Sequence, residues 1–264
     1  MIKKIMLFLL FSFSLGCSKI NNPNTSSSTS SSVNISSSSI NTTTSSSSTT
    51  SNANSSPLPQ STMSSSLVKP EIKYKILLIA GHGNGDPGAA YQNRLESNYN
   101  QDFVNLLTKE LNSFNIPIEI LLEPTPMKAI QEAELISKSN VDFVLSIHFN
   151  AGGGKGSEMI VPFYEKDFSF AYNFFDKLED NNFDVRETSV YSKSKNQRIK
   201  RNKNDKSYSY EDYFAVIRAG SKKKIPSYIL EVEFIDNVSQ MKIYDQRKEA
   251  YISLLAQNII EYFK

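Results

Sequence analysis

The stretch Ile76-Leu-Leu-Ile-Ala-Gly-His-Gly-Asn-Gly-Asp-Pro-Gly-Ala89 joins an uninterrupted apolar run to a glycine-rich loop. Such a run predicts a strand that is buried on both faces, as in the centre of a parallel sheet. The glycines allow the backbone to turn and to approach a ligand closely. His82 is therefore expected at the rim of an α/β sheet, where binding groups gather.

The only other histidine of the chain has the same setting. His148 lies in Val144-Leu-Ser-Ile-His-Phe-Asn-Ala-Gly152, where an apolar run again leads into small and turn-forming residues. Two histidines at the ends of two predicted strands favour a common site, such as that of a zinc hydrolase. On spacing alone, two satisfied buried histidines are an equally good interpretation.

Strands and helices alternate along the chain from residue 69 onward. The apolar patterns predict strands at 75–80, 116–122, 141–149, 158–164 and 227–235, and helices at 95–114, 127–139, 168–181 and 246–262. The polar and basic segment 184–213 is predicted to be an insertion or a mobile loop. This order predicts an α/β fold, a three-layer sandwich whose mostly parallel central sheet carries helices on both faces.

Residues 1–17 have the pattern of an export signal. Lys3 and Lys4 precede an apolar stretch at 5–15, which is shorter than the roughly 20 residues that a membrane span needs. The stretch ends at Cys17, the only cysteine, which therefore has no intramolecular disulfide partner. The segment resembles a bacterial lipoprotein signal, although Ser14 replaces the usual leucine-like residue. This resemblance implies an exported protein anchored to a membrane by a lipid on Cys17; a plain secretory signal is the alternative.

Residues 18–68 are rich in Ser, Thr and Asn and are predicted to be a disordered linker, because so polar a segment buries too little surface to offset its ordering entropy. A flexible tether of about 50 residues has an r.m.s. span on the order of 40 Å. Such a tether suits a domain that works at a distance from the membrane, and the cell wall is the obvious target. The remaining residues, 69–264, are of ordinary size for one domain.

The charge of the chain identifies no partner by itself, since the formal net charge is only +2. The segment Lys193–Lys206 is strongly basic. Such a run is most often a solvated loop, but it also suits an anionic polymer. An exported protein is not expected to bind nucleic acid, which leaves wall glycan as the better candidate.

A catalytic zinc ion takes about three protein ligands and keeps a position open for water. His82 and His148 supply two of them, and Glu96 is the best candidate for the third because it begins the helix after the glycine loop. The alternative is that Glu96 is simply an acid favoured in the first turn by the helix dipole.

The segment Gly81–Ala89, then Glu96, then Ser146-Ile-His-Phe-Asn-Ala151 resembles the zinc-dependent N-acetylmuramoyl-L-alanine amidases, the type-3 amidase domain of bacterial wall hydrolases. The resemblance covers the order and approximate spacing of the motifs, from about Lys75 to the C-terminus. It implies that His82, Glu96 and His148 bind Zn²⁺. It also implies that a glutamate on a late strand assists catalysis.

That late strand departs from the family pattern. In Leu230-Glu-Val-Glu-Phe-Ile-Asp-Asn237, Glu231 aligns with the catalytic glutamate, and Glu233 stands where glycine is usual. Alternation along a strand predicts that both carboxylates share one face. Glu233 is then either a second acid of the site or a block to substrate. The usual arginine-rich motif is also missing, with Glu123-Pro-Thr-Pro126 in its region.

The resemblance implies hydrolysis of the amide between the lactyl group of N-acetylmuramic acid and the first L-alanine of the stem peptide. Asp86 and Asn150 are candidates for orienting the histidines or lining the cleft, or are ordinary turn residues. Backbone N–H groups of Gly152–Gly154 are candidates for an oxyanion hole. Two alternatives are another zinc peptidase or carboxypeptidase, and a wall-binding lipoprotein that has lost turnover or is autoinhibited.

Overall fold

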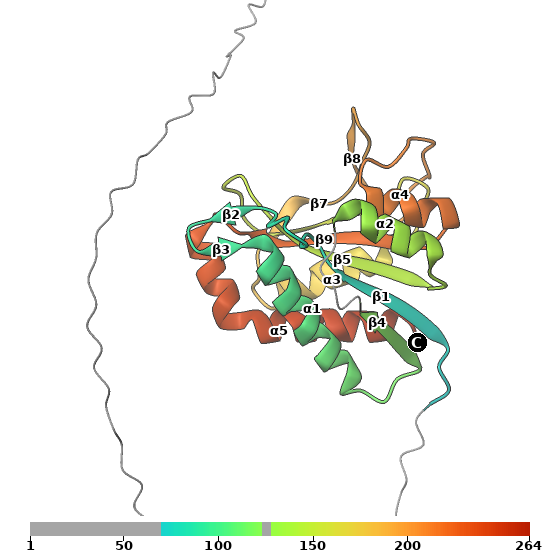
Figure 1. Cartoon of the computed structure of the whole chain (residues 1–264), viewed down its shortest axis with the longest axis horizontal. Coiled ribbons are helices and arrows are strands. Elements are labelled where there is room, and N and C mark those ends of the chain that lie inside the picture. Colours follow the sequence, from blue (N-terminus) through green and yellow to red (C-terminus); the bar gives the residue numbers. More distant parts are fainter. Residues whose placement is uncertain (1–69, 123–127) are drawn as a thin grey trace, which may run out of the picture. The chain divides into compact units, whose positions relative to one another are not determined.

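A computed structural model describes residues 70–122 and 128–264. A seven-stranded sheet organises them in the order β4-β1-β5-β9-β6-β7-β8 (Figure 1). The strands are β1 (Tyr74–Ala80), β4 (Ile118–Leu122), β5 (Phe143–Asn150), β6 (Ser157–Ile160), β7 (Val185–Lys193), β8 (Arg198–Lys200) and β9 (Ser227–Phe234). A separate two-stranded hairpin is formed by β2 (Ala90–Tyr91) and β3 (Arg94–Leu95).

The sheet is mostly parallel, which confirms the predicted fold class. Strand β1 pairs in parallel with β4 and β5, β5 with β9, and β6 with β7. Only the β6–β9 and β7–β8 pairs are antiparallel. The central strand β1 is buried from Ile76 to Ala80, as its uninterrupted apolar sequence predicts.

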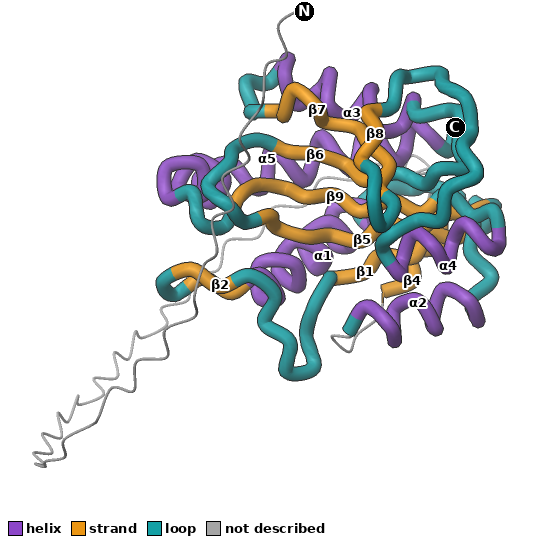
Figure 2. Tube along the Cα trace, turned by 90° about the horizontal axis from the view of Figure 1, so that it is seen from above, coloured by secondary structure: helices purple, strands orange, loops and turns teal. Residues whose placement is uncertain are grey.

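Helices cover both faces of the sheet (Figure 2). The helices are α1 (Glu96–Asn112), α2 (Ala129–Lys138), α3 (Ser169–Asp180), α4 (Ala215–Lys223) and α5 (Val238–Tyr262). One apolar core joins α1, α3 and α5 to the sheet, and a smaller core joins α2 and α4 to the other face. None of these helices combines the length and the apolar character needed to cross a membrane.

The prediction that residues 184–213 form a loop is wrong for residues 185–193 and 198–200. Most of the first half of this segment forms β7 and β8, which extend the central sheet at one edge. The side chain of Arg201 is fully buried, where its guanidinium donates hydrogen bonds to Ser192 Oγ and to the backbone oxygens of Pro162, Glu165 and Lys206. Arg201 is thus the one buried basic residue of Lys193–Lys206, and these oxygens together with the carboxylate of Asp205 satisfy its guanidinium.

Other differences from the predicted elements concern the helices and one hairpin. Helix α4 and the β2–β3 hairpin were not predicted, and α5 begins at Val238 rather than at residue 246. In helix α2 the apolar residue Ile130 is 80% exposed, whereas Glu132 is buried. The inward face of α2 therefore carries a carboxylate.

Candidate active site

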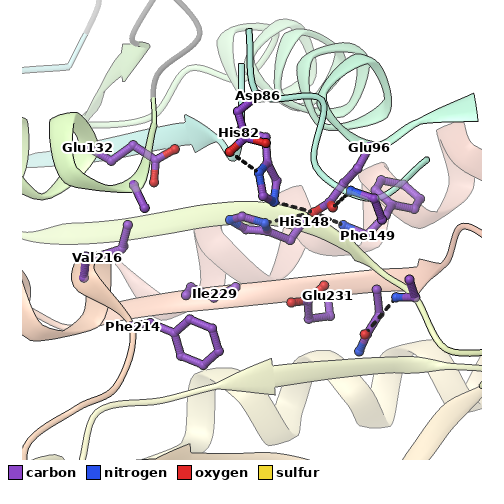
Figure 3. Close-up of a pocket in the computed structure, with 15 residues that line it drawn as sticks. His82, Asp86, Glu96, Glu132, His148, Phe149, Phe214, Val216, Ile229 and Glu231 are labelled. Atoms are coloured by element: carbon purple, nitrogen blue, oxygen red, sulfur yellow. Dashed lines mark hydrogen bonds and ion pairs between the residues drawn. The ribbon is translucent and has the colours of Figure 1, made fainter. Parts of the chain in front are cut away.

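The carboxyl ends of three parallel neighbours, β1, β5 and β9, bring the predicted site residues together. His82 follows β1, and His148 and Glu231 lie opposite each other in the register of β5 and β9. These residues line one cavity of about 370 Å³ together with Glu96 (Figure 3). The topology therefore explains why residues as distant in sequence as His82 and Glu231 meet at one rim of the sheet.

Glu96 lies between the two histidines. Its Oε1 atom is 3.0 Å from Nδ1 of His148 and 3.3 Å from Nε2 of His82. The same atom accepts a hydrogen bond from the backbone N–H of Phe149, and Oε2 accepts one from Ala89. Glu96 is the first residue of α1, as predicted, but its carboxylate is buried and points to the histidines rather than to solvent.

The loop after β1 holds His82 in place. His82 has a φ of 65°, and its Nδ1 atom lies 3.0 Å from Asp86 Oδ2. Asn100 on α1 donates to the carbonyl of Gly81 over 2.7 Å. A Cβ atom at Gly81 would lie 2.1 Å from Nε2 of His148, so only glycine allows the second histidine to approach this loop. The predicted orienting role of Asp86 agrees with this geometry.

The three groups shift one another's pKa values. Burial raises the pKa of Glu96, but hydrogen bonds from His148 and His82 outweigh burial and hold it well below its usual range. The hydrogen bond to Glu96 raises the pKa of His82 to about 9, against the opposing effect of burial. For His148, burial lowers the pKa, but Glu96 and Glu231 together raise it. An ionised carboxylate thus stabilises positive charge at this point.

The residues fit a bound cation. One ligand atom each from His82, Glu96 and His148 lies within 4.8 Å of the other two. Two imidazoles and one carboxylate are the ligand types of catalytic zinc sites. Asp86 also pairs with the outer nitrogen of His82, as a carboxylate behind a metal-binding histidine does.

Glu231 faces the same cavity from β9. In the described residues, its Oε2 atom is buried and has no hydrogen-bond partner. Burial raises the pKa of Glu231 to about 7, although the neighbouring His148 acts in the opposite direction. A carboxyl group with a pKa near neutrality, open to the cavity and beside the histidines, can take up and return a proton.

A charged network lies on the other side of Glu231. Glu158 of β6 is opposite Glu231 in the sheet register and is buried. Its Oε2 atom lies 2.8 Å from Nη2 of Arg198 and 3.1 Å from Nε of Arg186, and its Oε1 atom accepts hydrogen bonds from Asn150 and Tyr191. The predicted cleft residue Asn150 thus connects β5 to this network. The polar sequence of β7 and β8 did not indicate that its arginines face a buried acid.

Glu233 does not share the site of Glu231. Its Oε1 atom accepts hydrogen bonds from the backbone N–H groups of Gly156 and Phe234, both over 2.9 Å. It lines a separate, smaller cavity with Tyr244 and Tyr251 of α5. The register between β5 and β9 shifts after His148, which breaks the regular alternation of side chains. The expectation that Glu233 is a second acid of the site or blocks it is therefore wrong.

Two of the three N–H groups predicted as oxyanion-hole candidates already have a partner. The N–H groups of Gly152 and Gly153 both donate to Oδ2 of Asp236, over 2.8 and 2.9 Å. These two donors are therefore bonded to a side chain of the segment between β9 and α5. The segment Glu123–Pro126, which stands in the region of the missing arginine-rich motif, lies outside the described residues.

Sequence reasoning missed one acidic residue of the cavity. Glu132 is 1% exposed and lines the cavity from α2, together with Ala129, Phe214 and Val216. The available signal was its position: Glu132 lies three residues after Ala129 and four before Ile136, on the side of the helix that should be apolar. Because Glu132 is not apolar, the search for apolar periodicity did not identify it.

Comparisons with known proteins agree with this architecture. The catalytic domain of CwlV, an N-acetylmuramoyl-L-alanine amidase from Bacillus (Paenibacillus) polymyxa var. colistinus, superimposes with a TM-score of 0.54 at 19% identity, over 72% of this chain and 98% of that one. The N-acetylmuramoyl-L-alanine amidase of Clostridium difficile 630 gives a TM-score of 0.52 at 20% identity, over 71% and 93%. The N-acetylmuramoyl-L-alanine amidase AmiC2 of Nostoc punctiforme gives a TM-score of 0.52 at 15% identity, over 74% of this chain and 99% of that one.

At these identities the structural likeness supports the fold. Curated protein sequences gave no match. Residues 76–262, however, match the N-acetylmuramoyl-L-alanine amidase family as a whole. This match spans most of the chain and contains all four predicted site residues, and the chain therefore belongs to the N-acetylmuramoyl-L-alanine amidase family.

Proposed function

We propose that this protein is a zinc-dependent peptidoglycan hydrolase that cleaves the amide between the lactyl group of N-acetylmuramic acid and the L-alanine of the stem peptide. The observation that carries the proposal is the meeting of His82, Glu96 and His148 with Glu231 in one cavity. The family match supports the substrate and the bond, and the donor set supports zinc.

In this mechanism His82, Glu96 and His148 hold the zinc ion, and Asp86 fixes the orientation of His82. The chemistry that zinc supplies when bound is a lower pKa of water, to about 7, and polarisation of the scissile carbonyl. Glu231 accepts the proton of the attacking water and passes it to the departing amine nitrogen. Its carboxyl faces the cavity and has a buried oxygen without a partner among the described residues, which suits both roles, and such acid–base assistance contributes roughly 10² to 10⁴ in rate.

We further propose that the protein is exported and anchored by a lipid at Cys17, with residues 18–68 as a linker and 69–264 as the catalytic domain. The basis is the sequence pattern of residues 1–17 and the polar composition of the linker. An anchor with a long polar tether allows the domain to reach peptidoglycan away from the membrane.

A wall-binding protein without turnover was the main alternative from a different functional class, and Glu233 was the feature that favoured it. Since Glu233 is bonded to backbone groups outside the cavity, that argument no longer applies. The cavity also retains the residues needed for both metal binding and proton transfer.

The test is incubation of the full chain with purified peptidoglycan, with and without EDTA. We expect release of free L-alanine amino termini without new reducing sugars, and loss of this release in EDTA. The His148→Ala variant should lose both bound zinc and activity. Full activity in excess EDTA with no bound metal would contradict zinc dependence, whereas release at another peptide bond would indicate a different peptidase.

A further inference from the structure

Glu132 is a buried carboxylate for which neither the fold nor the proposed reaction gives a role. It is 1% exposed, and its Oε1 atom accepts no hydrogen bond from any described residue. Figure 3 shows its side chain entering the cavity from α2, with the two histidines between it and Glu231 in that view. Burying a carboxylate without a partner is costly, so a group that is not among the described residues is expected to complete it.

The charge of the cavity indicates what that group is. Among the described residues, the cavity is lined by four carboxylates, those of Asp86, Glu96, Glu132 and Glu231, and by no lysine or arginine. A zinc ion offsets two negative charges. The charges of two carboxylates, Glu132 and Glu231, then remain. Glu231 is neutralised when it accepts the proton of the attacking water. Glu132 is left without a positive partner in the part of the chain that the structure describes.

Burial raises the pKa of Glu132 to about 7, whereas the nearby histidines act in the opposite direction. The carboxylate is thus costly to ionise in the free protein, and the arrival of a cation in the cavity would offset that cost. Glu134, on the same helix, provides a contrast: it is exposed and already paired with Lys138 over 2.6 Å.

We propose that Glu132 is a specificity-determining residue that binds a primary ammonium group carried by the substrate. This inference rests on the proposed function, which supplies a substrate with such groups. Stem peptides carry an amine on a side chain, and glycan strands carry one wherever a sugar has lost its N-acetyl group. The stem peptide is the favoured source, because the amide to be cleaved joins it to the sugar at this cavity.

The experiment measures the affinity of soluble muropeptides for the full chain loaded with zinc. A Glu231→Gln background prevents turnover during the measurement. Three ligands are compared: a muropeptide with a free amine on its stem peptide, the same compound with that amine acetylated, and a third with the only free amine on its sugar. Each of the three ligands is titrated against three proteins in this background: one with Glu132 intact, one with Glu132→Gln, and one with Glu134→Gln as the control.

We expect the peptide amine to tighten binding about tenfold over its acetylated form, which corresponds to one charged hydrogen bond. Glu132→Gln should remove this preference, and Glu134→Gln should retain it. Thermal unfolding and zinc content establish that Glu132→Gln is folded and metal-loaded. Glutamine keeps the shape of the side chain, so a purely structural role would leave the preference for the amine unchanged.

Equal binding of the free and acetylated peptides would overturn the proposal. So would a preference for the sugar amine alone, or a second zinc ion per chain that Glu132→Gln removes. Turnover by the protein with Glu231 intact is scored separately as release of alanine termini. Amine-selective binding without release of alanine termini would contradict the proposed reaction but not the role of Glu132. Release of alanine termini without amine-selective binding would contradict the role of Glu132 but not the proposed reaction.

Discussion

Glu231 and Glu233 stand two residues apart on one strand, and their surroundings differ completely. Glu231 opens into the cavity beside His148, and its Oε2 atom has no partner in the described structure. Glu233 is also buried, but two backbone N–H groups saturate its Oε1 atom. Burial raises the pKa of both. Burial alone therefore does not distinguish a reactive carboxylate from a structural one; the distinction lies in whether the protein supplies the donors.

The same criterion separates Glu96 and Glu132. The carboxylate of Glu96 is bonded to two histidines and two backbone N–H groups, so its geometry is defined by the chain alone. Oε1 of Glu132 lacks any such contact among the described residues. Within this cavity the chain therefore holds Glu96 in a fixed position, whereas Glu132 remains available to a ligand that enters.

The largest effect expected from the comparison on β9 is on turnover. Glu231→Gln should retain zinc but lose turnover by roughly 10² or more, because the amide side chain cannot accept the proton of the attacking water. Glu233→Gln is the matched control and should turn over at nearly the normal rate. Release of alanine termini and metal content are measured for both variants. The opposite pattern would assign catalysis to Glu233.

A smaller effect is expected on stability. Glu233→Ala removes the acceptor of the Gly156 and Phe234 N–H groups and should lower the free energy of unfolding by about 2 kcal/mol, the typical cost of leaving buried donors unsatisfied. Glu233→Gln keeps an oxygen acceptor and should remain close to the unmodified protein. Urea denaturation of both variants provides the measurement. Equal stability of the two would show that these bonds contribute little.

The sequence was sufficient for the features that depend on local pattern. The apolar runs before His82 and His148 predicted two central strands, and parallel strands necessarily bring their carboxyl ends to one rim. The placement of Glu96 at a helix start indicated that it could fold back towards that rim. These inferences needed only periodicity and the direction of the strands.

The features that were missed depend on partners distant in sequence. Strand β7 looked like a loop because its polar residues are stabilised by contacts that alternation does not reveal, such as the pairing of Arg186 with Glu158. The separation of Glu231 from Glu233 depends on a register shift between β5 and β9. Neither a bulge nor a saturated carboxylate has a signature in the residues of one strand.

The smallest expected effect concerns the pH dependence of activity, which the ionisation of Glu231 governs. Its neighbour Glu158 is one of the groups that raise its pKa, and Glu158 also offsets the charges of Arg186 and Arg198. Glu158→Gln removes a negative charge and leaves the arginines uncompensated, so both changes lower the pKa of Glu231. Because Glu231 must be ionised to accept a proton, kcat/KM falls as the pH drops through its pKa.

The acidic limb of the pH profile should therefore move to lower pH in Glu158→Gln, by up to about one unit, which is the equivalent of 1.4 kcal/mol. Glu187→Gln, at an exposed position of β7, is the control and should leave the limb in place. A limb that moves to higher pH, or that moves equally in both variants, would mean that Glu158 does not act on the base. If the limb moves only in Glu158→Gln, the arginine network sets the pH range in which Glu231 works, while Glu233, saturated by backbone donors, takes no part in it.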